Sequence, residues 1–209
     1  MTDASTFEVE TRFSFGSRDE LFRRLPFLVP CLRYNEAWIT VFYGLDLFLT
    51  DQLLRIARIS TGVKERRFLG WKGIDIGKFA NIRQELQEDI TDGVHNSSIL
   101  HLIGAKVSLD STEAVVHELE HRGYKPFMEF SGKNVVGIYE PLDLKVKLMY
   151  CSALEHPLLL EIEKTATTNE DAIAAEIELQ LFTATYNLQQ NVVRQEPPDL
   201  LYARIFNSR

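Results

Sequence analysis

The feature that most constrains the fold is a segment near the start of the chain in which charged and uncharged side chains alternate. In FEVETRFSF, residues 7–15, Glu8, Glu10 and Arg12 are separated by single uncharged residues. Successive side chains of a β-strand point to opposite faces, so the two carboxylates and the guanidinium share one face. The fold must either expose this face to water or match its charges with others.

The same alternation recurs far along the chain. It supplies Arg83 and Glu85 in IRQELQE, Lys145 and Lys147 in LDLKVKLM, and Glu161 and Glu163 in LLLEIEK. One interpretation is a solvated sheet face with apolar residues turned inward. However, three leucines directly precede the last two glutamates, which indicates a strand buried on both faces. Buried carboxylates need cations as partners, so a closed β-barrel with a polar interior is the alternative.

The remaining patterns predict an α+β domain built from many antiparallel strands and about three helices. Residues 38–104 have the composition of strands broken by glycine turns. Helices are expected from Ser17, where a capping box begins, from a cap at Asp110 or Ser111 to a stop at Gly123, and from about Asn169.

Two expectations concern the last third of the chain. In the helix that begins near Asn169, apolar residues recur at helical spacing, so one buried face is expected. Its members are Ala172, Ile173, Ile177, Leu181 and Tyr186. The tail VVRQEPPDLLYARIF is expected to be irregular, with apolar anchors.

Composition limits the classes of function. The 209 residues suit one globular domain, and a formal net charge of -7 argues against binding to duplex DNA. No apolar run is long enough to cross a membrane, and the polar segment MTDASTFEVE does not resemble a secretory signal. With Cys31 and Cys151 expected as free thiols, the sequence favours a cytoplasmic protein.

One motif has a structural explanation that outweighs its chemical one. HELEH, residues 117–121, matches the His-Glu-x-x-His pattern of zinc proteases. Val115 and Leu119 mark the buried side of this helix, and both histidines point largely away from them. We therefore interpret His117 and His121 as part of a solvated helix face.

The charged segments together resemble a known family. EVETR resembles the Glu-x-Glu-x-Lys signature of the CYTH superfamily, the triphosphate tunnel metalloenzymes. LLRIAR, GWKG, IRQELQE and LLLEIEK follow in the order of the family's other motifs, and QEPPDLLYARI is similar to the tail of class IV adenylate cyclases. The resemblance covers essentially the whole chain. It implies a single-domain α+β fold over residues 1–209, an eight-stranded antiparallel β-barrel with flanking helices.

The resemblance also implies roles for individual residues. It implies metal ligands at Glu8, Glu10, Glu161 and Glu163, and catalytic roles for Glu8, Glu10 and Arg12. Substrate-binding residues would be Arg12, Arg55, Lys72, Arg83 and Glu85, with Arg58 and Lys133 at positions where the motifs are incomplete. Lys145 and Lys147 are added as candidates that could restore the positive charge lost there; the resemblance itself does not imply them.

Several positions depart from the family's pattern. Arg12 stands in place of the signature lysine, and Ala57 stands where a second tunnel arginine is expected. Lys133 with Val135 is what remains of a Lys-x-Arg strand, and the family's aspartate near Met149 is absent. These departures affect the chemistry of the tunnel more than its fold.

The resemblance predicts a Mg²⁺- or Mn²⁺-dependent phosphohydrolase that acts on a small triphosphate-bearing molecule, as a monomer or homodimer. Inorganic triphosphate, thiamine triphosphate and nucleoside triphosphates are the candidate substrates. Two alternatives remain open: a class IV-type adenylate cyclase that makes cyclic AMP from ATP, and a tunnel that binds a phosphorylated ligand without turnover.

Overall fold

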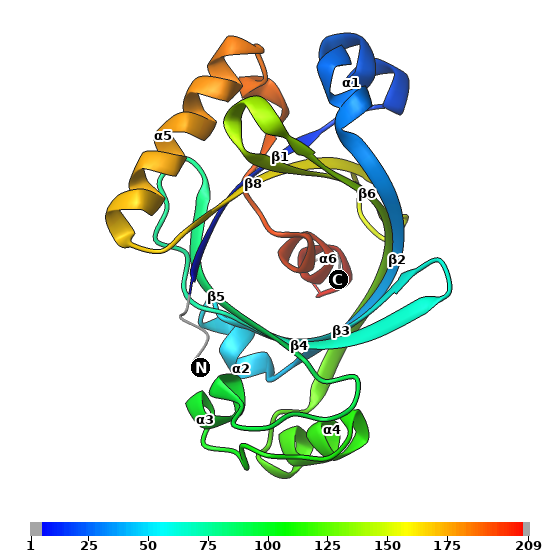
Figure 1. Cartoon of the computed structure of the whole chain (residues 1–209), viewed down its shortest axis with the longest axis vertical. Helices are drawn as coiled ribbons and strands as arrows, with labels where there is room; N and C mark the ends of the chain where they lie inside the picture. Colours follow the sequence, from blue (N-terminus) through cyan, green and yellow to red (C-terminus); the bar gives the residue numbers. More distant parts are fainter. Residues whose placement is uncertain (1–5, 207–209) are drawn as a thin grey trace. The chain divides into compact units, whose positions relative to one another are not determined.

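The structure is a computed structural model in which residues 6–206 are described (Figure 1). The segment MTDASTFEVE, which is not expected to be a secretory signal, therefore lies partly outside the described residues. The strands are β1 (Thr6–Ser14), β2 (Leu32–Tyr43), β3 (Leu53–Thr61), β4 (Lys64–Lys72), β5 (Asn81–Asp89), β6 (Pro126–Tyr139), β7 (Leu144–Tyr150), β8 (Leu158–Ala166) and β9 (Val192–Val193). The α-helices are α1 (Arg18–Arg24), α2 (Leu45–Leu49), α3 (Ser98–Leu102), α4 (Thr112–His121), α5 (Asn169–Thr185) and α6 (Pro197–Phe206).

The strands pair in the order β5-β4-β3-β2-β6-β7-β8-β1-β9, and β5 also pairs with β1. This additional pairing closes eight strands into a barrel, with β9 added at β1. The predicted α+β class and eight-stranded antiparallel barrel are confirmed. The chain forms two compact units: unit 1 contains mainly Trp38–Asp75 and Arg83–Ser131, and unit 2 contains Phe7–Ala37, Ile76–Ile82 and the chain from Gly132 onward.

In unit 2 the register of three strands aligns their charged residues. On β1 and β8, Arg12 lies opposite Glu161 and Glu10 lies opposite Glu163. On β7 and β8, Lys147 lies opposite Glu161 and Lys145 lies opposite Glu163. Directly opposite residues share a sheet face, so these charges form one continuous surface across β1, β8 and β7.

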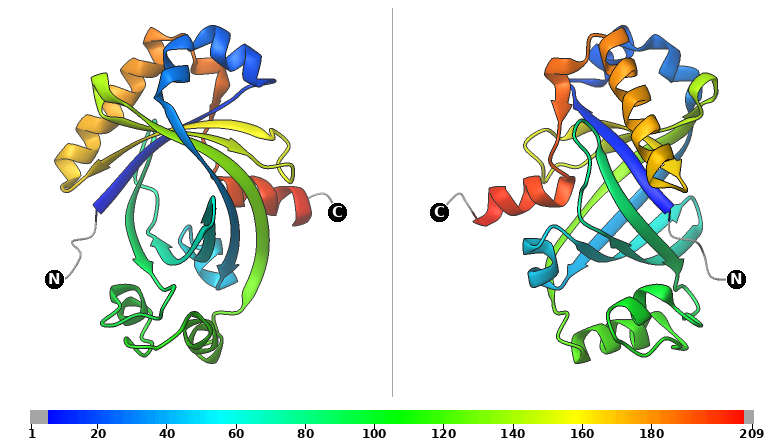
Figure 2. Two further views of the ribbon diagram at one scale, coloured as in Figure 1. Left: turned by 45° about the vertical axis from the view of Figure 1, so that its right-hand side comes forward. Right: turned by 90° about the vertical axis from the view of Figure 1, so that its left-hand side faces the viewer.

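The other face of the same strands is the apolar core of unit 2. Val9 and Phe13 of β1 and Ile162 of β8 are fully buried there, together with Leu179 and Phe182 of α5. Figures 1 and 2 show α5 lying along β8. Because helices cover the apolar face, β1 and β8 are buried on both sides, as the leucines before Glu161 indicate.

The predicted buried face of α5 is wrong in three of its members. The residues Ile173, Ile177 and Leu181 are exposed by 47%, 53% and 62%. Leu179 and Phe182 are buried instead, alongside the alanines at 172 and 175. The helix carries apolar residues on two sides, so spacing alone cannot choose between them. The side with alanines packs inward because small side chains let the helix approach the sheet closely.

Unit 1 has its own core on one face of β3, β4 and β5. Leu54 and Ile56 of β3 and Leu69 of β4 are buried with Val115 and Leu119 of α4. His117 and His121 lie on the exposed side of α4, which confirms the solvated-face interpretation of HELEH.

Two helices begin where the capping patterns predict, but the tail differs from its prediction. The hydroxyls of Ser17 and Ser111 accept hydrogen bonds from the first turns of α1 and α4, as the capping patterns predict. The tail expected to be irregular contains α6, which begins at Pro197. Proline suits the first turn of a helix, because its missing N–H would have no helical partner there. Cys31 and Cys151 are free thiols.

Candidate functional site

The candidate site lies on the charged face of unit 2, defined as Glu8, Glu10, Arg12, Lys145, Lys147, Glu161 and Glu163. The four glutamates and Arg12 are buried, with residue exposures between 1% and 8%. The lysine side chains are more open, with exposures of 50% for Lys145 and 22% for Lys147. The interpretation as a solvated sheet face is therefore wrong for the carboxylates and for Arg12.

Arg12 is the centre of this network. Its Nε donates to Glu161 Oε1 at 3.2 Å, and its Nη1 donates to Asn81 Oδ1 at 2.9 Å. Its Nη2 lies 2.8 Å from Glu10 Oε1 and 3.8 Å from Glu196 Oε2. Burial by itself would lower the pKa of the guanidinium, but the surrounding carboxylates outweigh burial and raise that pKa. Arg12 is thus a permanent cation enclosed by acceptors.

The two lysines of β7 hold the two glutamates of β8. Lys145 Nζ donates to both Oε1 and Oε2 of Glu163 at 2.9 Å. Lys147 Nζ forms an ion pair with Glu161 Oε2. Burial opposes the charged form of each ammonium, but the nearby glutamates raise the pKa of both lysines. Both lysines are therefore charged at neutral pH.

Two partners of Arg12, Asn81 and Glu196, were not predicted from the sequence. Asn81 directly follows a turn whose Lys78, Phe79 and Ala80 N–H groups donate to Glu176 Oε1 at 2.7, 2.6 and 3.0 Å. Glu196 lies within QEPPDLLYARI, the segment that is similar to the tail of class IV adenylate cyclases, so the resemblance pointed to this segment. Nothing in the sequence shows that this segment returns to β1.

The charged face suits a divalent cation in donor chemistry. Glu196 joins its four glutamates around Arg12, and Mg²⁺ and Mn²⁺ prefer oxygen ligands. Within residues 6–206, however, no three acidic, histidine or cysteine side chains are already grouped for a metal ion. The metal prediction remains a prediction.

Unit 1 carries a second set of predicted residues on β3, β4 and β5. Arg55 lies opposite Gly70 in the register, and its Nη2 donates to Glu85 Oε1 at 3.1 Å. A Cβ at Gly70 would lie 3.1 Å from Arg55 Nε, so the glycine gives the arginine room to cross β4. Lys72 is buried and lies directly opposite Glu85.

Arg83, also in unit 1, donates its hydrogen bonds to Asp51 and to the backbone of Gly73. Its Nη1 donates to the backbone oxygens of Asp51 at 2.7 Å and Gly73 at 2.6 Å. Its Nη2 donates to Asp51 Oδ1 at 2.5 Å. Asp51 has a positive φ of 62°, so Arg83 holds a strained turn. Its predicted role as a phosphate ligand remains a prediction.

Two of the predicted substrate-binding residues lie on the wrong face of their strands. Arg58 is on the face of β3 that carries Leu54 and Ile56, and its Nε lies 3.8 Å from Glu65. Lys133 is exposed and lies opposite Tyr150, on the face away from Lys145 and Lys147. Alternation along a strand excludes both residues from the charged surfaces.

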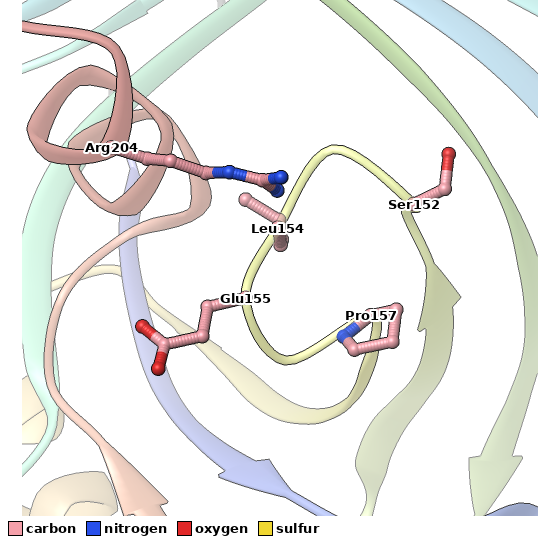
Figure 3. A pocket seen from close by; sticks show the side chains of 5 residues that line it. All are labelled: Ser152, Leu154, Glu155, Pro157 and Arg204. Carbon is pink, nitrogen blue, oxygen red and sulfur yellow. The ribbon is translucent and has the colours of Figure 1, made fainter. Parts of the chain in front are cut away.

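Unit 2 also has a pocket of about 530 Å³. Among the described residues, Ser152, Leu154, Glu155, Pro157 and Arg204 line it, as Figure 3 shows. Arg204 reaches from α6 and donates to the backbone oxygen of Ala153 at 2.5 Å. None of the predicted site residues lines this pocket.

Solved structures resemble this chain in fold. The PH1819 protein of Pyrococcus horikoshii has a TM-score of 0.72 and 17% identity, covering 94% of this chain and 99% of its own. A Vibrio parahaemolyticus protein provisionally named an adenylate cyclase has a TM-score of 0.68 and 12% identity, over 95% and 99%. A Hippeastrum protein described as having a dominant triphosphatase activity has a TM-score of 0.58 and 15% identity, over 95% and 96%.

At these identities the likeness shows the fold. The chain therefore shares the overall fold of these neighbours. No protein-family model matches the sequence, and no curated protein matches it significantly. Within residues 6–206, no helix is both long enough and apolar enough to cross a membrane.

Proposed function

We propose that this protein binds a triphosphate-bearing small molecule at the charged face of unit 2 and hydrolyses one of its phosphoanhydride bonds. The observation that carries the proposal is the buried surface of β1, β8 and β7, on which carboxylates and cations lie directly opposite one another. Phosphoryl transfer needs positioning and charge neutralisation more than covalent help. A triphosphatase activity is also named for one structural neighbour.

The exposure of each cation decides its role in the proposal. The side chain of Lys145 is half exposed, so its ammonium can bind a phosphate oxygen while it remains beside Glu163. Arg12 is enclosed by its acceptors, so it acts as a positioning residue that holds Glu10 and Glu161. This differs from the direct phosphate contact that the family resemblance implies for Arg12.

In the proposed reaction, a β1 carboxylate, Glu8 or Glu10, positions a water molecule opposite the bond to be broken. The water oxygen attacks the terminal phosphorus, the phosphoanhydride bond breaks, and the shortened phosphate chain leaves with the electron pair of that bond. The carboxylate accepts the proton of the water. When bound, a Mg²⁺ or Mn²⁺ ion would be held by carboxylates from Glu8, Glu10, Glu161 and Glu163, and it would neutralise charge on the phosphate oxygens.

We also propose that the protein is cytoplasmic and is a monomer or a homodimer. Its substrate is a small molecule, and it does not bind duplex DNA.

The likeness to the Vibrio protein favours a second candidate function, adenylate cyclase activity. There the ribose 3′ oxygen of ATP would attack the α-phosphorus, and pyrophosphate would leave. The dense ion pairing of the charged face favours a third candidate, binding of a phosphorylated ligand without turnover.

One assay separates the three candidates. Tripolyphosphate, ATP and thiamine triphosphate are incubated with the protein, with and without Mg²⁺ or Mn²⁺. We expect release of phosphate; cyclic AMP would identify the cyclase, and binding without product would identify the non-catalytic protein. Absence of both products and binding would contradict the proposal.

A matched pair of variants tests the location of binding. Lys145→Ala removes a charge-assisted contact, which is worth roughly 1.5–3 kcal/mol. We therefore expect its affinity for tripolyphosphate, measured by calorimetry in EDTA, to fall about ten- to a hundredfold. Lys133→Ala removes a lysine from the opposite face, and it should bind like the parent. Equal loss in both variants would show that the charged face is not the binding site.

A further inference from the structure

We propose that the outer side of α5 is the surface through which two copies of this chain associate, with their two α5 helices antiparallel. This surface, which we call the α5 stripe, consists of Glu170, Ile173, Ile177, Leu181 and Ala184. The inference concerns assembly, and it does not depend on the proposed hydrolysis.

The α5 stripe carries three large apolar side chains on an exposed helix face. Ile173, Ile177 and Leu181 are all exposed, and they follow one another at intervals of four residues. Residues at this spacing lie in one line along a helix. The inner side of α5 packs along β8, and Figures 1 and 2 show no other described element of unit 2 over its outer side. A continuous apolar line of this kind marks a surface for a protein partner.

The charges of α5 argue against a membrane as the partner. The helix contains no lysine or arginine, and its exposed charged residues are Glu170, Asp171 and Glu178. Helices that lie on anionic membranes carry lysine and arginine beside their apolar face. Glu178 is paired with Lys164, so the unbalanced negative charge lies in the first turn. The surface therefore suits an apolar partner that presents a positive charge at one end.

The opposite end of α5 has such a positive charge beside it. Arg24 of α1 donates from Nη2 to the backbone oxygen of Asn187 at 2.6 Å and from Nη1 to Asn191 Oδ1 at 2.7 Å. Asn187 comes two residues after the end of α5, and Arg24 is exposed. Unit 2 thus presents an apolar line with a negative first turn and a cation at its far end.

A second copy of the chain complements this arrangement when the two helices are antiparallel. In a pair centred on Ile177, Ile173 of each copy lies beside Leu181 of the other. Glu170 of each copy then lies beside Ala184 of the other and within one turn of its Arg24. The positive end of each helix dipole also lies beside the negative end of its partner, which favours the same orientation. A parallel pair would instead place the two acidic first turns together.

The size of the α5 stripe predicts a weak and reversible dimer. A helix of 17 residues is about 25 Å long and about 10 Å wide, so one side of it covers roughly 250 Å². Stable interfaces bury about 800 Å² on each partner. We therefore expect a dissociation constant in the micromolar range.

Sedimentation equilibrium of the full chain measures this dimer. Ile177→Glu brings two carboxylates together at the centre of the pair, so the dissociation constant should rise at least about tenfold. Val63→Glu is the matched control, because Val63 is an exposed apolar residue at the turn between β3 and β4. It should leave the dissociation constant unchanged. Circular dichroism checks that both variants remain folded, as expected for exposed positions.

A second pair of variants tests the charge at the end of the α5 stripe. Glu170→Lys places a cation near Arg24 of the other copy, so the dissociation constant should rise about threefold or more. Glu155→Lys makes the same change of charge at another exposed position of unit 2. It should dimerise like the parent.

Cysteine cross-linking tests the antiparallel orientation. Under mild oxidation Ile177→Cys should form a covalent dimer, because the two copies of this position meet at the centre. Ile173→Cys alone should not, but its mixture with Leu181→Cys should. The parent, which contains Cys31 and Cys151, is the control for the native thiols.

Three results would overturn the inference. The first is a parent that stays monomeric at roughly 1 mM. The second is dimerisation of Ile177→Glu as tight as that of the parent. The third is cross-linking of Ile173→Cys with itself as fast as that of Ile177→Cys, which would show a parallel pair. None of these measurements uses a phosphate compound, so failure of the proposed hydrolysis would leave them unchanged.

Discussion

At the scale of single residues, the main feature of this protein is the buried guanidinium of Arg12. Arg12 has 1% exposure, and its N–H groups face the side chains of Glu10, Glu161, Asn81 and Glu196. A planar guanidinium can address several acceptors at fixed angles, whereas an ammonium is a compact point charge. This geometry suits an arginine at the position where the motif that EVETR resembles has a lysine.

We expect Arg12→Ala to destabilise the protein by about 3–5 kcal/mol, because it leaves buried carboxylates without their shared cation. Arg12→Lys keeps the positive charge but loses the planar guanidinium with its several N–H donors. The loss of stability in Arg12→Lys should therefore be about half as large. Urea unfolding measures both values.

Arg33→Ala is the control for the Arg12 variants, because Arg33 forms an exposed ion pair with Glu140. Such pairs contribute about 0–1 kcal/mol. If Arg12→Ala were as mild as Arg33→Ala, the buried network would not stabilise the fold.

At the scale of elements, α5 does more than cover β8. Glu176 is buried in it and accepts three backbone N–H groups from the turn at Lys78, Phe79 and Ala80. Arg194 Nη1 donates to the Ala80 oxygen at 2.9 Å and holds the other side of the same turn. The helix therefore fixes the position of Asn81 beside Arg12.

Glu176→Ala should cost about 3 kcal/mol or more, since it leaves three N–H groups without their acceptor and each unmet group costs about 1–3 kcal/mol. Hydrogen exchange should show faster exchange at Lys78, Phe79 and Ala80.

Glu178→Ala, two residues further along α5, removes an exposed partner of Lys164. It should cost less than about 1 kcal/mol. Unchanged protection of the turn in Glu176→Ala would show that the turn is held by other contacts.

At the scale of the whole molecule, the order of strand pairing joins segments far apart in the chain. Arg12 and Glu161, which face each other on β1 and β8, are 149 residues apart. By contrast, β3 and β4 form a hairpin around Gly62. Long-range pairing closes large loops before it gains any contact energy, so it slows folding.

We expect refolding from urea on a timescale of milliseconds to seconds, typical of folds with distant strand pairs. Pulsed hydrogen exchange during refolding should show the amides of β3 and β4 protected before those of β1 and β8. Simultaneous protection of the four strands would contradict this order and would indicate that the charged face forms together with the hairpin.

The sequence by itself determined the charged strands and the face on which most of their charges lie. Alternation in EVETR and LLLEIEK is a local property, because a strand places every second side chain on the same side. The same rule excludes Arg58 and Lys133, which are out of phase with the charged faces once the register is known. Helix starts at Ser17 and Ser111 were also local, since a capping hydroxyl acts within one turn.

Only the tertiary structure decided which charges meet. Asn81 and Glu196 reach Arg12 from segments whose sequence gives no sign of their destination. The inward side of α5 was settled by packing, because both sides of the helix carry apolar residues. The pairing of Lys145 with Glu163 and of Lys147 with Glu161 depends on a register between strands. Alternation fixes the face of a side chain, but only the register between two strands fixes its partner.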